Sequence, residues 1–467
     1  CIRDRTFGNI AWDDGAEAPR AIDSVALTLT PGARLTFDTL PELAGLNLSC
    51  AGSVSLASSV EDATAESLLA GVRTVDFSGV TGTVDMALAA SQNLTAQPWR
   101  YAGGGGSTNA VLRITHNGGT VAIGQGNYRL GESASSTATT VTMDGAEVGY
   151  SDSFGIGTAT YELGGTTTVT TPKLILSQDG NGRSAALTLK GNAALTVTGE
   201  TNADNNTSSI MFGHWNGPST FTLRDSATFT AENAQVLIGK TYNNHTINVE
   251  GGSFAAKGIT LSANATGTNV LNLSGGTLRL GEVGLGTYAA ANTLAVNVSG
   301  TPALEASADF SVAHAVALAE GSVLKVKPNG HTITFNKNFT GTGALRLEGA
   351  GTVSLTGDGA AFAGTVEVKA GTLVLGKRFR PVVAGVAEGA TLIVTANPED
   401  KITGSHVITL APGAEAGGTV KVMGSNNVVV GSHIVTPEEA AAGQVTVTFT
   451  AEPTRRRGIS YAVFCLK

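Results

Sequence analysis

One pattern recurs along most of the chain and limits the folds open to it: a short strand of alternating apolar and polar residues, a glycine corner, and a second such strand. Its clearest copy is residues 271–280, LNLSGGTLRL. Further copies are residues 161–166 (YELGGT), 247–254 (INVEGGSF) and 366–375 (VEVKAGTLVL). From Tyr161 to Ile408 the copies begin mostly about 20 to 30 residues apart, a period typical of a solenoid.

The pattern has a simple physical meaning. Alternation with a period of two places Leu, Val, Ile and Phe on one face of each strand and polar residues on the other. One unit cannot bury its apolar face alone, but parallel strands stacked about 4.8 Å apart share a continuous core. Roughly sixteen coils would form a rod of about 75 Å. An antiparallel sandwich or barrel would also have short strands and glycine turns, but the regular apolar residues around each glycine favour the solenoid.

This interpretation assigns a direction to individual side chains. Leu273, Leu278, Leu347 and Val368 should point inward, and the polar residues Asn272, Arg279, Arg346 and Lys369 should face solvent. Glycine permits the sharp corners and the close approach of neighbouring backbones. The expected repeat corners are Gly164, Gly165, Gly251, Gly252, Gly275, Gly276 and Gly371.

Two segments interrupt the strand pattern with helical signals. Residues 59–70 carry three acidic residues and a pair of leucines before Gly71. In the second segment Thr436 is the expected N-cap, Pro437 lies in the first turn, Glu439 completes a capping box and Gly443 ends the helix. We expect three parts: residues 1–102, an irregular N-terminal β section or cap with a short helix; residues 103–424, the regular solenoid; and residues 425–467, a C-terminal cap or assembly segment.

Composition excludes several classes of protein. The 29 basic and 37 acidic residues give a net charge of −8, which argues against nucleic acid as the main partner. The sequence contains no apolar stretch of about 18 residues, so no transmembrane helix is predicted. Three cysteines among 467 residues do not form a disulfide scaffold.

Residues 341–375, GTGALRLEGAGTVSLTGDGAAFAGTVEVKAGTLVL, closely resemble the autotransporter-associated β-strand repeat of bacterial surface passenger proteins. The resemblance is looser over about residues 109–424. It implies an all-β, right-handed parallel β-helix exported to the cell surface or beyond, here with short helical insertions and irregular ends. It does not imply an enzyme, since such passengers are mostly stalks or adhesins. Too few strands are expected after Gly424 to form the C-terminal translocator barrel of a complete autotransporter, so either another part was removed or export follows a different route.

The motifs that would carry chemistry are incomplete. Residues 371–378 and 234–241 imitate a phosphate-binding loop, but their central positions form apolar strands rather than a loop of free amides. The acidic pairs lie in irregular ends, helices or turns, and the seven histidines are scattered singly. We therefore predict no catalytic residues, no cofactor and no metal.

The loop around residues 211–218, MFGHWNGP, is the best candidate for contact with a glycan. His214, Trp215 and Asn216 combine an aromatic face with hydrogen-bonding groups, as sugar recognition requires. The alternative is that Phe212 caps the core and Trp215 covers a corner of the coil. Aromatic residues make up only 5% of the chain, which leaves little material for an extended carbohydrate groove.

The ends of the chain suggest anchoring and assembly. Cys1 is compatible with a lipid anchor or with a disulfide to Cys50 in a mature exported form or a fragment. The final strand, residues 459–466, is apolar and includes Ile459, Tyr461, Val463, Phe464 and Leu466. It is expected either to join the N-terminal section of the next copy head to tail, with Cys465 near Cys1, or to fold back on its own last coil.

Two functions remain open at this point. The first is a secreted or surface-displayed, non-enzymatic β-solenoid that acts as a stalk, a fibre or filament subunit, or an adhesion surface for a host or matrix glycan or protein. The second is a β-helix protein that binds or degrades a polysaccharide. The two differ in whether carboxylates with Arg or Lys line one long concave face.

Overall fold

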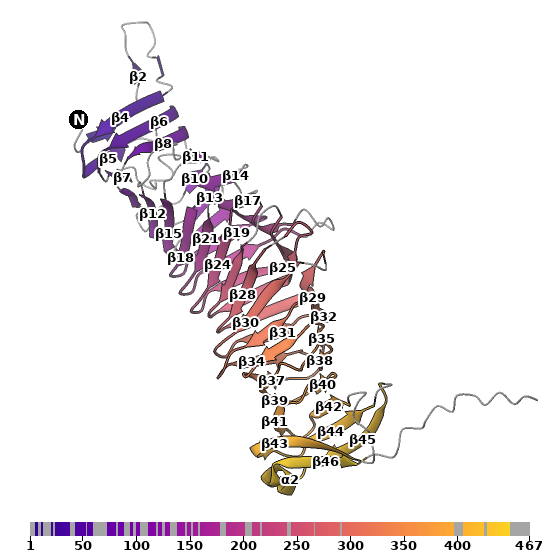
Figure 1. The fold of residues 1–467 in the computed structure, drawn as a ribbon. Coiled ribbons are helices and arrows are strands. Elements are labelled where there is room, and N and C mark those ends of the chain that lie inside the picture. Colours follow the sequence, from indigo (N-terminus) through magenta and orange to yellow (C-terminus); the bar gives the residue numbers. More distant parts are fainter. Residues whose placement is uncertain are drawn as a thin grey trace, which may run out of the picture.

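The computed structural model describes the side chains of residues 26–34, 50–52, 154–156, 160–177, 184–200, 208–214, 217–240, 244–265, 267–289, 292–396, 405–424 and 427–448, and elsewhere between residues 5 and 159 it describes the backbone of the strands. The chain folds into an elongated rod of stacked β coils (Figure 1). The predicted all-β parallel solenoid is confirmed. All described strand pairs are parallel except β2–β3, β43–β46 and β44–β45, whose bounds are given below.

Two long sheets run along the rod, and a coil in its middle contributes one strand to the first and two to the second. The first sheet consists of β1 (Arg5–Phe7), β5 (Ala33–Phe37), β7 (Val54–Ser58), β9 (Thr83–Ala87), β12 (Val111–Asn117), β15 (Ala138–Asp144), β18 (Ala159–Gly164), β21 (Ala185–Leu189), β24 (Ser219–Leu223), β26 (Thr246–Val249), β28 (Asn269–Leu273), β30 (Leu294–Val298), β33 (Val316–Leu318) and β36 (Phe339–Gly341).

The second sheet begins with β4 (Ser24–Leu29), β6 (Leu43–Cys50), β8 (Val72–Val80), β10 (Leu94–Ala96), β11 (Arg100–Ala102), β13 (Thr120–Ile123), β14 (Asn127–Leu130), β16 (Glu147–Tyr150), β17 (Ser153–Ile156), β19 (Thr168–Thr171), β20 (Leu174–Leu176), β22 (Ala194–Val197), β23 (Ile210–Phe212), β25 (Thr228–Ile238), β27 (Ser253–Leu261) and β29 (Thr277–Thr287).

It continues with β31 (Ala303–Ala306), β32 (Phe310–Val312), β34 (Val323–Lys327), β35 (Thr332–Phe335), β37 (Ala344–Leu347), β38 (Thr352–Leu355), β39 (Thr365–Val368), β40 (Thr372–Leu375), β41 (Val382–Val386), β42 (Thr391–Thr395), β43 (Ser405–Glu415), β44 (Thr419–Met423), β45 (Val429–Ile434) and β46 (Gln444–Thr448). The short pair β2 (Ala11–Trp12) and β3 (Arg20–Ala21) stands apart, and the helix α2 (Pro437–Ala442) lies near the C-terminal end of the rod (Figure 1).

The parallel register stacks equivalent residues of successive coils above one another. In the first sheet, Leu187, Phe221, Ile247, Leu271 and Val296 form one such inward column, and all five are buried. Burying each side chain of this size contributes about 1.5–3 kcal/mol relative to exposure. The apolar core therefore runs from coil to coil without interruption through this part of the rod.

The side-chain directions expected from the alternation are confirmed. Leu273, Leu278, Leu347 and Val368 are buried with at most 2% of their surface exposed. Their polar neighbours Asn272, Arg279, Arg346 and Lys369 are all half-buried or exposed. Aromatic rings fill the wider levels of the core, including the cluster of Phe221, Phe229 and Phe254, whose ring centroids lie 4.6–5.6 Å apart.

Glycine corners join the strands of one coil. Gly165, Gly252, Gly276 and Gly371 have positive φ, and their partners Gly164, Gly251 and Gly275 precede them at the same turns. At Gly276 two separate features of the structure require a glycine. Its φ is +62°, and a Cβ atom there would lie 2.4 Å from the carbonyl carbon of Gly251 in the previous coil. The turn conformation and the coil spacing both exclude a side chain at this position.

An asparagine ladder crosses the outer face of the first sheet. Asn248, Asn272 and Asn297 occupy one register column, so their side chains stack. Asn297 Nδ2 donates to Asn272 Oδ1 over 3.0 Å, and Asn272 Nδ2 donates to Asn248 Oδ1 over 2.9 Å. Asn248 Nδ2 in turn donates to Thr222 Oγ1 over 3.2 Å. The coils are thus joined by side chains as well as by the backbone.

Pairing changes direction near the C-terminal end of the rod. β45 runs antiparallel to β44, and β46 runs antiparallel to β43, with α2 between them in the chain. Helix α2 has the expected capping box: Thr436 Oγ1 accepts from the Glu439 backbone N–H, the Glu439 side chain accepts from the Thr436 backbone N–H, and Gly443 ends the helix with φ of 73°. The helix expected at residues 59–70 lies outside the described residues.

The three expected parts can be compared with the pairing. The parallel ladder is continuous across residues 102 and 103, because β11 pairs with β8 before it and with β14 after it. The change to antiparallel pairing falls between β44 and β45, next to residue 425.

We expect Gly276→Ala to destabilise the fold more than Gly389→Ala does. Both glycines have positive φ, so each substitution carries a backbone cost of about 1–2 kcal/mol. Nothing lies within 4 Å of a Cβ at Gly389, whereas the Gly251 backbone blocks Gly276. Close contact should add roughly 1–3 kcal/mol at Gly276 alone. Urea unfolding measures the difference, and equal losses for the two variants would contradict the close stacking of coils.

Candidate functional site

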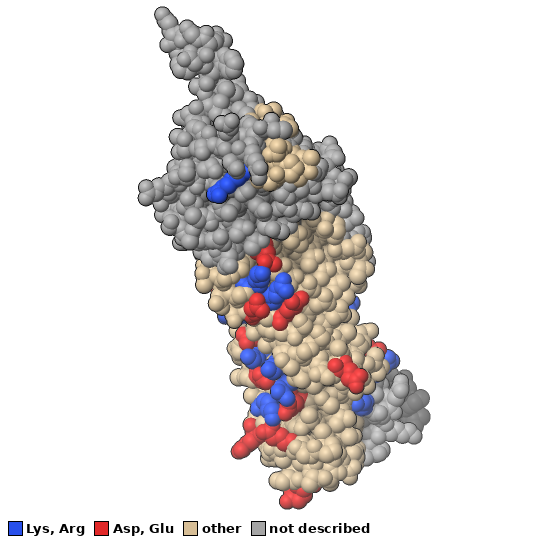
Figure 2. All heavy atoms as spheres, turned by 90° about the vertical axis from the view of Figure 1, so that its left-hand side faces the viewer, with Lys and Arg blue, Asp and Glu red and all other residues tan. Residues whose placement is uncertain are grey.

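Charged side chains gather in a band that follows the rod (Figure 2). In the second sheet the parallel register places opposite charges in one column, since Arg279 is paired with Glu305 and Glu305 with Lys327. Lys327 Nζ lies 3.1 Å from Glu305 Oε1. Lys257 and Glu282 form a further pair at 3.0 Å. The band is therefore built from ion pairs between coils.

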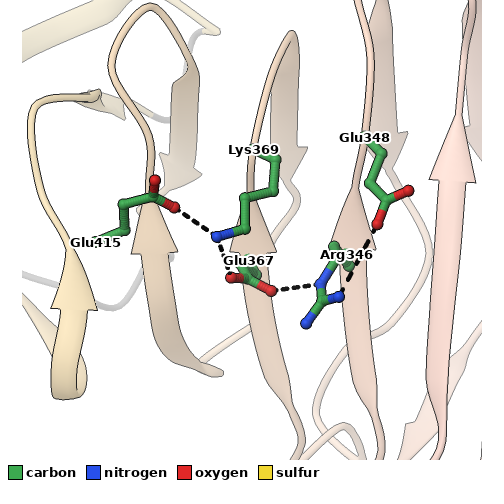
Figure 3. Close-up of polar contacts among 5 residues, drawn as sticks. All are labelled: Arg346, Glu348, Glu367, Lys369 and Glu415. Atoms are coloured by element: carbon green, nitrogen blue, oxygen red, sulfur yellow. Dashed lines mark hydrogen bonds and ion pairs between the residues drawn. The ribbon is translucent and has the colours of Figure 1, made fainter.

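Five charged residues form a cluster near β37, β39 and β43 (Figure 3). Glu367 lies between Arg346, whose Nε donates to it, and Lys369, whose Nζ lies 2.7 Å from Glu367 Oε1. Lys369 Nζ also lies 2.6 Å from Glu415 Oε2, and Arg346 lies 4.0 Å from Glu348. Three negative and two positive side chains thus alternate across three strands.

The electrostatics of Glu367 indicate what this cluster can do. Burial by itself raises the pKa of the Glu367 carboxyl, but Lys369 and Arg346 outweigh that effect and hold the pKa below its ordinary value. The hydrogen bonds that Lys369 Nζ donates to Glu367 and Glu415 raise the pKa of Lys369. A general acid in glycoside hydrolysis needs a raised carboxyl pKa, so the environment of Glu367 is opposite to that requirement. The cluster suits permanent charge pairing between coils.

Of the three residues expected to contact a glycan, the structure describes only His214. Its Nε2 lies 3.1 Å from Lys240 Nζ of the next coil, and the ring is half-buried. Trp215 and Asn216 lie outside the described residues. The possible contact of these three residues with a glycan stays a prediction.

Two residues that the sequence did not single out lie farther along the same flank. Tyr288 is 41% exposed, and its hydroxyl accepts a hydrogen bond of 2.9 Å from Gln235 Nε2. Gln235 is only 4% exposed, so this bond fixes the phenol ring from below. An exposed ring held by a buried amide is a rigid apolar surface with a polar edge, which suits contact with a sugar. The one sequence feature that could have drawn attention to Tyr288 is the rarity of aromatic residues in this chain.

Two buried histidines, His314 and His245, have a structural role: they form hydrogen bonds with the backbone of neighbouring coils. His314 Nδ1 accepts from the Leu294 N–H over 3.2 Å, so its Nε2 carries the proton and donates to the Gly286 carbonyl over 3.0 Å. Burial, together with the nearby Lys337 charge, lowers the pKa of His314 and keeps the ring neutral. His245 Nδ1 likewise accepts from the Ser219 N–H over 3.1 Å. Both rings have structural partners in neighbouring coils.

Other expected sites are placed only in part. Cys50 is buried at the end of β6, with 3% of its surface exposed. Cys1, Cys465 and the expected assembly strand with Ile459, Tyr461, Val463, Phe464 and Leu466 lie outside the described residues. Within the described part of the chain no three His, Cys, Asp or Glu side chains are grouped so that they could hold a metal ion. No helix there has the length and apolar character to cross a membrane.

Comparison with protein families, with curated proteins and with solved structures found no match to this chain.

We expect Glu367→Gln to weaken the fold at neutral pH and to have little effect in acid. The folded pKa of Glu367 lies below its unfolded value, so its stabilisation is present above the unfolded pKa and is lost as the pH falls through the folded pKa. The partners are partly exposed, which limits the loss to about 1 kcal/mol. Urea unfolding at pH 7 and pH 3 measures this.

The matched control is Glu320→Gln, which changes an exposed carboxylate with no ion pair among the described residues. A Glu367→Gln loss that is the same at both pH values, or no larger than that of the control, would contradict the role of the cluster.

Proposed function

We propose that this protein is a non-enzymatic structural β-solenoid of the bacterial cell surface or extracellular space, acting as a stalk, a fibre subunit or an adhesion surface. The observation that carries the proposal is the parallel ladder, which continues from β4 to β44 and whose core, where side chains are described from Phe154 onward, is filled by the chain's own side chains. Such a ladder gives a long, stiff body whose outer faces repeat from coil to coil. Length and repetition are the properties that a stalk or an adhesion surface needs.

The use of the charged residues supports a structural role. Where carboxylates lie on the sheet faces, Lys or Arg of the same or a neighbouring coil neutralises them, as at Glu305, Glu367 and Glu415. A polysaccharide-cleaving β-helix needs two carboxyl groups with different pKa values directed at one sugar bond. Arg346 and Lys369 hold the pKa of Glu367 below its ordinary value and so make it a poor proton donor, which favours the non-enzymatic proposal.

The resemblance of residues 341–375 to autotransporter passenger repeats supports export and surface display. In this stretch β37, β38, β39 and β40 stack in parallel register. We propose a host or matrix glycan or protein as the partner of the outer faces. For residues 459–466 two arrangements stand as alternatives: head-to-tail association with a second copy, which a filament would require, and folding back on the same chain.

A second function, binding of a polysaccharide without cleavage, is favoured by one observation. Tyr288 presents an exposed ring whose hydroxyl is held by the buried Gln235 amide. His214 and Lys240 add a polar pair on the same flank. These groups suit stacking and hydrogen bonding to a sugar.

The two functions can be separated with the purified chain, negative-stain images and a panel of neutral and acidic polysaccharides. The structural proposal predicts rods in the images and no release of reducing ends from any polysaccharide. Release of reducing ends would contradict it. For the second function, glycan binding that Tyr288→Ala abolishes and Val407→Ala leaves intact would support a sugar-binding flank, since Val407 is an exposed side chain on β43.

A further inference from the structure

Strand β45, which runs antiparallel to β44, has one edge to which no other described strand is paired. It pairs with β44 through register partners from Thr419–Ile434 to Met423–Val429. Within the described residues no strand pairs with its opposite edge. That edge carries a row of backbone N–H and C=O groups that can accept another strand.

The side chains of this edge are unusually apolar for a strand at the end of a sheet. Val429 is 46% exposed and Ile434 is 61% exposed, and Val428, just before the strand, is 52% exposed. Natural sheets protect such edges with lysine, proline or inward charges. β45 has none of these, and its one titratable residue, His433, bonds through Nε2 to Glu439 of α2 over 2.9 Å. The edge is therefore suited to strand addition.

We propose that β45 is the acceptor for an added strand, and that the strand is residues 459–466 of the same chain. The described chain ends at Thr448, the last residue of β46, which follows β45 after α2. Ten residues, 449–458, separate Thr448 from Ile459 and can span up to about 33 Å. That reach exceeds the length of β45, about 20 Å for six residues. The segment ISYAVFCL carries no charge and presents apolar side chains on both faces.

The size of the contact favours the chain's own segment over a second copy. A strand of six residues covers much less than the ~800 Å² per partner that stable complexes bury. Association of two chains also costs several kcal/mol of lost translational and rotational freedom. A segment tethered by a short linker has an effective concentration in the millimolar range and avoids most of that cost. The added strand would cover Val429 and Ile434 and close the rod at this end.

Hydrogen exchange of the full chain tests the proposal against a variant that lacks residues 459–467. We expect peptides covering residues 429–434 to exchange at least roughly tenfold faster in the truncated protein, because the amides at the open edge lose their acceptors. Peptides covering β28 serve as an internal control and should not change. Light scattering should give a monomer for both proteins.

Two results would overturn the proposal. Unchanged exchange in residues 429–434 would mean that the segment does not pair with β45. Protection that depends on protein concentration and accompanies a larger mass would assign the edge to a second copy.

Cross-linking provides an independent measurement. In a chain with Cys1→Ser, either Val429→Cys or Ile434→Cys should form a disulfide with Cys465 within one chain, and the reactive position reveals the direction of the added strand. Glu320→Cys, an exposed position on another coil, should not. Failure of both β45 variants to react faster than this control would also contradict the proposal.

Discussion

The backbone hydrogen bonds between neighbouring coils are the interaction on which the rest of this structure depends. A short strand cannot satisfy its N–H and C=O groups within its own coil, so each coil is stable only with a coil above and below it. Parallel pairing then places equivalent residues about 4.8 Å apart, which produces inward apolar columns such as Leu187–Phe221–Ile247 and outward polar ones. It also explains Gly276, because the backbone of the previous coil occupies the place of a side chain.

The outward columns repeat weak side-chain interactions along the rod. A single surface ion pair contributes about 0–1 kcal/mol and a single side-chain hydrogen bond about 1 kcal/mol. In this rod many such contacts join two coils: Glu367 contacts Arg346 of the preceding coil, and Lys369, beside Glu367 in its own coil, reaches Glu415 of β43. The asparagine ladder of Asn248, Asn272 and Asn297 does the same on the first sheet. These side chains reinforce the stack without forming a reactive centre, in keeping with the proposed structural function.

The features that could be predicted from the sequence are those set by residues close together along the chain. The alternation, the glycine corners and the capping box at Thr436 and Glu439 are local patterns, and the structure has them. The columns depend on register between coils of unequal length: the contacting pairs are 24 residues apart at Asn248–Asn272 but 21 apart at Arg346–Glu367. No fixed spacing therefore reveals them. For the same reason His214 was identifiable as a candidate, whereas its partner Lys240 and the Tyr288–Gln235 pair, contributed by other coils, were not.

Cross-linking between coils tests most directly whether the chain stacks in parallel register. Asn248→Cys combined with Asn272→Cys places two thiols one coil apart in the same outward column, at a spacing of about 4.8 Å that lies within the range for a disulfide. Asn248→Cys combined with Asn297→Cys places them two coils apart, about 10 Å, which is too far. The stacked solenoid predicts a rapid disulfide in the first protein and none in the second. Equal reactivity of the two pairs, or no disulfide in either, would contradict it.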